Sequence, residues 1–172
     1  MKDREARKKE LEETLIIIDY YRKGENRISQ SNRNDIYQLQ ISRDNHIDHR
    51  KGIKYWDVGD LYDMSNMFNS LDFNLDISRW NVSRVTDMNC MFCNCYKFYQ
   101  DINCWDVRNV TNMSFMFACT GFNQYIGDWH VNENLSVNQM FKENKNFKPE
   151  MLKGKGWKNI TPEQLISMGI DK

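Results

Sequence analysis

The sequence predicts a single-domain α/β repeat protein, a right-handed solenoid of about four stacked coils. Two observations predict it: three columns of large side chains recur every 24 or 25 residues, and each repeat divides into two halves with different apolar spacing. We expect each column to form a ladder of stacked side chains in the core. The columns are Trp56, Trp80, Trp105 and Trp129; Phe68, Phe92, Phe117 and Phe141; and Phe73, Phe98, Phe122 and Phe147.

The two halves of a repeat predict different secondary structure. In the second repeat, Val85, Met88, Met91 and Phe92 have helical spacing, which predicts about two turns of α- or 3₁₀-helix. Residues 77–82 are rich in branched and aromatic side chains, which favour a short strand. Stacked coils would pair these strands in parallel on one face and place the helical segments on the other. This division, with a period in the twenties, is typical of a leucine-rich-repeat-like solenoid.

The two ends of the chain predict caps for the stack. Residues 53–147 hold the four coils, and residues 1–52 form the N-terminal cap. That cap would contain a helix over 4–23 and a first strand near 37–41. An uncapped repeat array would expose an apolar face and polymerise, so both ends need such cover.

Residues 148–172 predict the C-terminal cap. Thr161 has the position of an N-cap residue, with Pro162 first in the helix and Gln164 completing a capping box. Gly169 would end this helix. The apolar residues expected to pack against the last coil are Trp157, Leu165 and Met168.

The composition of the chain excludes some classes of function. Lys and Arg total 24, as do Asp and Glu, so the net charge is zero and the chain is not a general nucleic-acid binder. The longest apolar cluster is too short to span a membrane. The charged N-terminus has no signal-peptide pattern, which predicts an intracellular, cytoplasmic protein. The abundance of Asn, Lys, Ile and Tyr is typical of an AT-rich genome, which suits a viral protein in a host cell or virion, or a parasite protein.

Two segments carry a family resemblance. The segments FNLDISRWNVSRVTDMNCMF at 73–92 and FYQDINCWDVRNVTNMSFMF at 98–117 resemble the BspA-like leucine-rich-repeat surface proteins, and residues 122–141 do so loosely. The resemblance covers about residues 53–147. It implies a non-enzymatic repeat scaffold used for adhesion or protein binding. Together with the missing export signal, it predicts an intracellular or virion-associated binding module.

The candidate binding surface is the exposed strand face beside the tryptophan column. Its polar residues carry charges of both signs, which suits a protein partner, but such positions are also ordinary solvated turns. We expect a monomer or weak self-association. An alternative function is a structural component that self-associates end to end, for example in a virion. The candidate partner-binding residues are Tyr55, Asp57, Arg79, Asn81, Asp106, Asp128 and His130.

Five cysteines leave a weaker alternative, a thiolate metal protein. Cys90 and Cys93 have a spacing used by zinc sites, yet both lie among core residues and no second cysteine pair follows. Cys95 and Cys119 occupy near-equivalent positions of adjacent coils and could pair on oxidation. The HIDH segment at 46–49 lacks a register that would hold a metal. No nucleophile, acid-pair or phosphate-loop motif is present, so we expect neither an enzyme nor a cofactor nor a metal.

Overall fold

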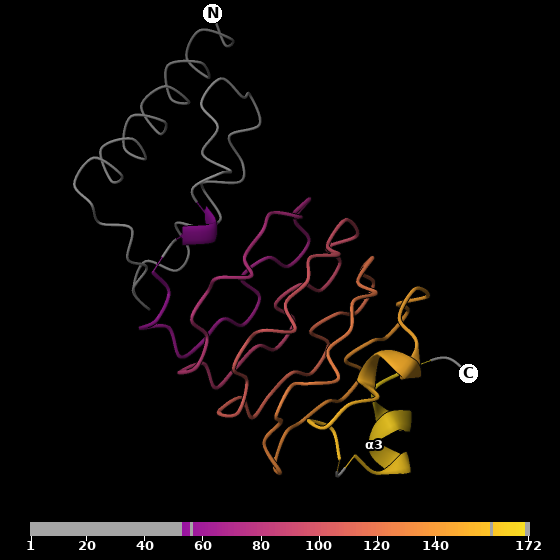
Figure 1. Cartoon of the computed structure of the whole chain (residues 1–172). Helices are drawn as coiled ribbons and strands as arrows, with labels where there is room; N and C mark the ends of the chain where they lie inside the picture. Colours follow the sequence, from indigo (N-terminus) through magenta and orange to yellow (C-terminus); the bar gives the residue numbers. More distant parts are fainter. Residues whose placement is uncertain (1–52, 56, 159, 171–172) are drawn as a thin grey trace, which may run out of the picture.

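The computed structural model describes residues 53–55, 57–158 and 160–170. Figure 1 shows coils of similar shape lying side by side, from the purple segment near residue 53 to the yellow C-terminal end. We number the four coils by their Phe68, Phe92, Phe117 and Phe141. The helical elements of the described residues are short and lie at the two ends: 3₁₀-helices η2 (Ile53–Tyr55) and η3 (Pro149–Leu152), and the α-helix α3 (Pro162–Ser167).

The predicted α/β architecture is wrong for the coils. The described residues contain no β-sheet, so the leucine-rich-repeat-like solenoid with a strand face and a helical face is not formed. Adjacent coils have instead one isolated parallel bridge each, one residue long, together with further backbone hydrogen bonds from coil to coil. These bridges join Asp63 to Asp87, Asp87 to Asn112, and Asn112 to Ser136.

A run of overlapping β-turns replaces the expected helix. In the second coil, the N–H groups of Met91, Cys93 and Cys95 donate to carbonyls three residues back, at 2.9–3.1 Å. The N–H groups between them, on Phe92 and Asn94, donate to carbonyls of the third coil at 3.0 and 2.9 Å, as does the preceding Cys90 N–H at 2.9 Å. An α-helix uses every N–H for a carbonyl four residues back. Because alternate N–H groups leave the segment, no helix forms there.

Left-handed backbone residues maintain this run of turns. Residue 90 has φ +53°, and the preceding Met88 carbonyl accepts from Met91, so Cys90 holds the third position of a type II turn. A helix of L-residues cannot continue through such a conformation. The three-residue apolar spacing that predicts a helix therefore follows the turns instead. The non-glycine residues with positive φ are Asn66, Ser70, Cys90, Asn94, Phe115, Cys119, Gln139 and Glu143.

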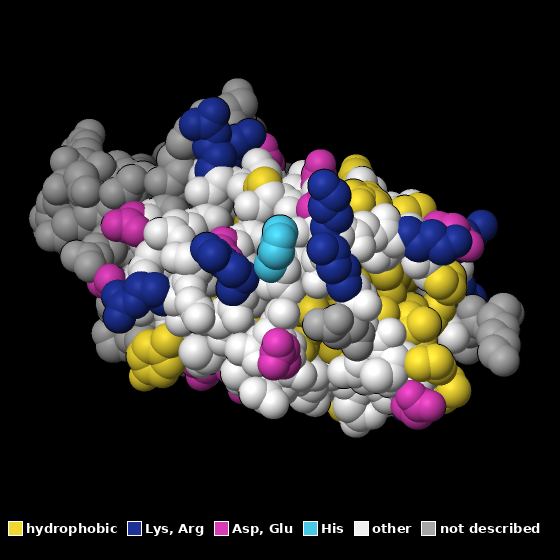
Figure 2. All heavy atoms as spheres, turned by 60° about the horizontal axis from the view of Figure 1, so that its bottom comes forward, with side chains coloured by type: hydrophobic (Ala, Val, Ile, Leu, Met, Phe, Trp, Pro, Cys, Tyr) yellow, Lys and Arg dark blue, Asp and Glu magenta, His cyan; other side chains and the backbone are white. Residues whose placement is uncertain are grey.

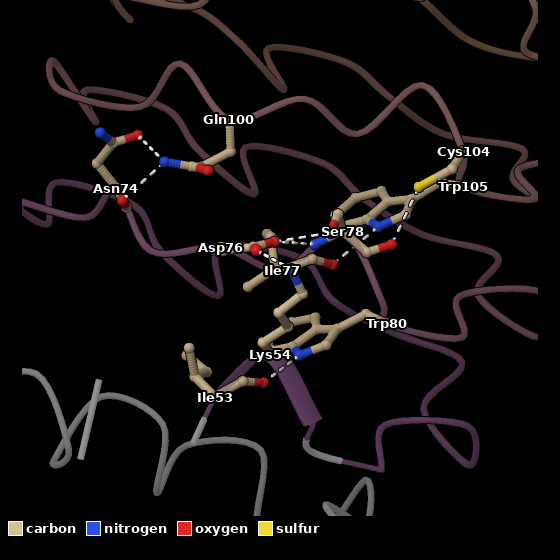
Figure 3. Close-up of polar contacts among 10 residues, drawn as sticks. All are labelled: Ile53, Lys54, Asn74, Asp76, Ile77, Ser78, Trp80, Gln100, Cys104 and Trp105. Atoms are coloured by element: carbon tan, nitrogen blue, oxygen red, sulfur yellow. Dashed lines mark hydrogen bonds and ion pairs between the residues drawn. The ribbon is translucent and has the colours of Figure 1, made fainter. Parts of the chain in front are cut away.

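The predicted strand over residues 77–82 is also absent, because this half of the coil is again made of turns. The Trp80 N–H donates to the Ile77 carbonyl at 3.1 Å and the Val85 N–H to the Val82 carbonyl at 2.9 Å. Indole N–H groups supply links to the preceding coil, and Figure 3 shows two of them. The donor–acceptor pairs are Trp80 to Ile53 (2.7 Å), Trp105 to Ile77 (3.2 Å), Trp129 to Ile102 (3.0 Å) and Trp157 to Ile126 (2.8 Å).

Two parallel columns of phenylalanine rings fill the core. Within the second coil, the rings of Phe92 and Phe98 stack with centroids 3.8 Å apart. Toward the third coil, Phe92 lies 5.8 Å from Phe117 and Phe98 lies 5.9 Å from Phe122. The same arrangement repeats in the other coils, and all eight rings are buried. Ring stacking from coil to coil therefore joins the repeats where a β-sheet is missing.

The C-terminal cap closes the last coil. The Thr161 side chain accepts from the Gln164 N–H and the Gln164 side chain from the Thr161 N–H, which confirms the predicted capping box of α3. Gly169 follows the helix with φ +70°. The N–H groups of Gln139 and Phe141 donate to carbonyls at the end of α3, which stand where a fifth coil would be.

The predicted N-terminal cap, its helix over 4–23 and its strand over 37–41 lie outside the described residues, as does Trp56. Among the residues that the structure describes, no helix has the length and apolar character that crossing a bilayer requires.

Candidate functional site

Three of the predicted binding residues build the turns beside the tryptophan column. Asp57, Asn81 and Asp106 each accept, on a side-chain oxygen, the N–H two residues further on, at 3.0, 3.2 and 3.3 Å. This is the Asx-turn geometry that favours Asp and Asn at such positions. The recurrence of these residues has a structural cause, although Asp57 and Asn81 remain exposed to solvent.

Hydrogen bonds between coils set the turns side by side. Asn109 donates to the Ser83 carbonyl at 2.7 Å, and Asn132 donates to the Arg108 carbonyl at 3.3 Å. Figure 2 shows one face of the molecule, on which basic, acidic and histidine side chains lie among uncharged ones. The turns therefore hold a polar surface in a fixed arrangement.

The other predicted binding residues have different surroundings. Arg79, Asp128 and His130 are exposed. Asp128 accepts hydrogen bonds from the Tyr125 hydroxyl and the Asn103 amide, both at 3.2 Å. Of Tyr55, only the backbone is described, as the last residue of η2.

An open pocket of about 380 Å³ lies between the ends of neighbouring coils. Figure 3 shows its polar contacts: Lys54 forms an ion pair with Asp76, the Ser78 hydroxyl donates to the same carboxylate, and Gln100 donates to the Asn74 amide oxygen. The predicted set of partner-binding residues does not include this group. The recurrence of Asp76 and Asp101 at the repeat period is a signal that could have found it. The pocket is lined by Asp76, Ser78, Gln100, Asp101, Asn103 and Cys104.

Hydrogen bonds from neighbouring residues stabilise the ionised forms of Asp76 and Asp106. Burial acts to raise the pKa of Asp76, but hydrogen bonds from Lys54 and Ser78 outweigh it, and the pKa falls to about 2. Hydrogen bonds from Arg108 lower the pKa of Asp106. Both carboxylates are therefore ionised at neutral pH and unsuited to proton transfer.

The Asp76 ion pair makes a pH-dependent contribution to stability. Because the folded pKa of about 2 lies below the ordinary 3.8, this contribution is present above about pH 4 and is lost as the pH falls toward 2. The Asp76 side chain is 42% exposed, so solvent screening limits the effect to about 1 kcal/mol. We expect the wild type to lose this much relative to Asp76→Asn between pH 5 and 2.5, measured by urea unfolding. Lys54→Met should show the same reduced acid sensitivity; a wild-type pH profile in both variants would contradict the assignment.

A second pocket, of about 570 Å³, lies at another corner of the coils. The Tyr96 side chain beside it is 71% exposed, and Lys97 pairs with Asp72 at 2.6 Å. No sequence signal marked this corner, because its residues fall in the loop whose length varies between repeats. Its lining residues are Ser70, Leu71, Asp72, Asn94, Tyr96 and Lys97.

All five cysteines are free thiols. Cys95 is buried and donates to the Phe73 carbonyl at 3.2 Å, whereas Cys119 contacts the Glu143 carboxylate at 3.7 Å. The two thiols thus have separate neighbours, and the suggested Cys95–Cys119 pair is not formed. Within residues 53–55, 57–158 and 160–170, no group of three or more His, Cys, Asp or Glu could hold a metal ion. The HIDH segment at 46–49 lies outside these ranges.

A comparison with protein families matches residues 37–154, more than half of the chain, to the family described as "Mycoplasma protein of unknown function, DUF285". The chain belongs to the DUF285 family. The DUF285 match spans all four coils and η3. No curated protein and no solved structure matches this DUF285 chain. The likeness to BspA-like proteins stays a prediction.

Proposed function

We propose that this DUF285 chain is a non-enzymatic protein-binding module. Its binding surface is the polar face formed by the turns beside the tryptophan column, which includes Arg79, Asn81, Asp106 and His130. The observation that carries the proposal is the coil-to-coil hydrogen bonding that fixes these turns relative to one another.

A fixed surface suits binding because little conformational entropy is lost on association. The backbone of each turn is held by an Asx hydrogen bond and by the neighbouring coils, so its exposed side chains start from defined positions. Arg79 and His130 extend from this backbone into solvent. Basic and acidic side chains on one surface favour a partner with complementary charges, which sets specificity and association rate.

The chemistry of the described polar groups favours binding over catalysis. Burial raises the pKa of the Cys104 thiol beside the 380 Å³ pocket, so this thiol is protonated at neutral pH and a weak nucleophile. The Asp and Asn side chains of the coils are used in turns and ion pairs. Neither observation supplies an activated acid, base or nucleophile.

The test is a pull-down from an extract of cells that contain the protein, comparing wild type with Arg79→Glu plus His130→Glu. Neither residue closes an Asx turn, so the fold is kept while the surface charge changes. We expect partner recovery to fall about tenfold or more.

The matched control is Lys145→Glu plus Asn146→Asp, which changes the charge by a similar amount at another corner of the fourth coil. We expect this control variant to recover as much partner as the wild type does. Equal recovery by both double variants would overturn the assigned surface. A light-scattering mass several times that of one chain would favour the alternative function as an assembly component.

A further inference from the structure

Cys90 and Cys93 stand at the first and last positions of one β-turn. The Cys93 N–H donates to the Cys90 carbonyl at 3.1 Å and closes the turn. The Cα atoms at the ends of a β-turn lie less than about 7 Å apart, and a disulfide spans about 4.4–6.8 Å between Cα atoms. The backbone therefore already holds these residues at a separation that a disulfide can bridge.

The two thiols also lie near each other, because each one perturbs the pKa of the other. At the equivalent positions of the first coil, the first and last side chains of the turn meet, because the Asn69 amide donates to the Asn66 amide oxygen at 3.1 Å. The same turn geometry can therefore bring the Cys90 and Cys93 side chains together.

Cys90 and Cys93 differ from the nearby Cys95 in their exposure to solvent. Cys90 and Cys93 are both partly exposed, whereas Cys95 is fully buried and bonded to a backbone carbonyl of the first coil. Cys93 lies near enough to Cys119 of the third coil to contribute to the raised pKa of the Cys119 thiol, but the Cys119 hydrogen bond goes to Glu143. A small oxidant therefore reaches Cys90 and Cys93 and has Cys93–Cys119 as the competing product.

We propose that Cys90 and Cys93 form a reversible intra-turn disulfide, a redox modification site in the second coil. With a small disulfide such as oxidised glutathione, the Cys90 thiolate attacks one sulfur and releases one glutathione thiolate. The Cys93 thiolate then attacks the Cys90 sulfur of the mixed disulfide and releases the second. The protein loses two protons and two electrons, and the oxidant gains them as two glutathione thiols.

The rate of this reaction depends on pH. Burial raises the pKa of both thiols, that of Cys93 to about 11, so the reactive thiolates are scarce at neutral pH. Oxidation is therefore slow at pH 7, and its rate rises steeply, by up to roughly tenfold per pH unit, while the thiols remain mostly protonated.

The test treats the folded Cys104→Ser protein with oxidised glutathione, because Cys104 is exposed and would react separately. The protein is then unfolded in urea, the remaining thiols are blocked with N-ethylmaleimide, and the masses of the tryptic peptides are measured. Peptide 85–97 contains Cys90, Cys93 and Cys95. We expect it to lose two hydrogen atoms and to carry one blocking group, on Cys95. A fully blocked peptide, a peptide that keeps glutathione, or one cross-linked to peptide 109–142 through Cys119 would overturn the proposal.

Two further variants distinguish the pair from its neighbours. Cys93→Ala introduces the residue that the third coil has at this position, Ala118, and should leave a stable mixed disulfide on Cys90. Cys119→Asn introduces the residue of the second coil, Asn94, and should oxidise as before. Loss of the Cys90–Cys93 product in Cys119→Asn would show that Cys119 takes part and would also overturn the proposal.

Discussion

Replacing Phe117 with alanine is expected to lower the free energy of unfolding by about 3–5 kcal/mol. The ring is fully buried in the third coil. It stacks on Phe122 of the same coil at 4.1 Å, on Phe92 at 5.8 Å and on Phe141 at 5.6 Å. Removing it leaves a cavity between coils that backbone hydrogen bonds hold at a fixed spacing, so the neighbours cannot collapse into the space.

The matched control is Phe115→Ala, two residues away in the same turn run. Phe115 is only partly buried and holds a left-handed conformation with φ +57°, so its replacement should cost less than about 1 kcal/mol. Urea unfolding followed by tryptophan fluorescence gives both values. Equal losses for the two variants would show that the ring ladder is not the main source of stability.

The ring columns could be predicted from the sequence because burial leaves a regular trace. Phe92, Phe117 and their equivalents must be large and apolar in every coil, so their period shows in the sequence. The indole contact of Trp157 was not predicted as part of the tryptophan column. Trp157 lies 28 residues after Trp129, off the period, yet donates to the Ile126 carbonyl as the other indoles donate to their preceding coils.

The secondary structure of the coils could not be predicted from the spacing of apolar residues. Successive turns space these residues by three positions and an α-helix has 3.6 residues per turn, so the two patterns are almost the same over a short segment. Val85, Met88 and Met91 fit either. Positive φ at Cys90 decides for turns, and a cysteine gives no sign of that conformation, which usually favours Gly or Asn.

For three of the predicted binding residues, the structure shows a role that the sequence did not indicate. An exposed Asp or Asn beside a buried Trp is compatible with binding or with closing a turn, and Asp57, Asn81 and Asp106 close turns. The Lys54–Asp76 ion pair joins residues 22 positions apart, and only the stacking of coils brings them together. Pairings of that kind have no local sequence pattern.

Asn144 is a buried polar residue whose partners could not be predicted from the sequence either. Its replacement is the second substitution expected to lower the free energy of unfolding strongly. Asn144→Ala is expected to destabilise the protein by about 3–4 kcal/mol. The Asn144 side chain is 5% exposed. Its amide donates to Thr120 and to the Phe122 carbonyl, both at 3.0 Å, and its oxygen accepts the Asn146 and Phe147 N–H groups. Alanine would leave several buried backbone groups without partners.

The comparison that tests this role is Asn146→Ala, measured by the same urea unfolding. Asn146 lies two residues away, is exposed, and is bonded to Asn144 through its backbone N–H, so its replacement should cost below about 0.5 kcal/mol. A cost below about 1 kcal/mol for Asn144→Ala would mean that water replaces the lost bonds. Because these bonds connect the third coil to the fourth, a large cost shows that polar contacts as well as ring stacking hold the coils together.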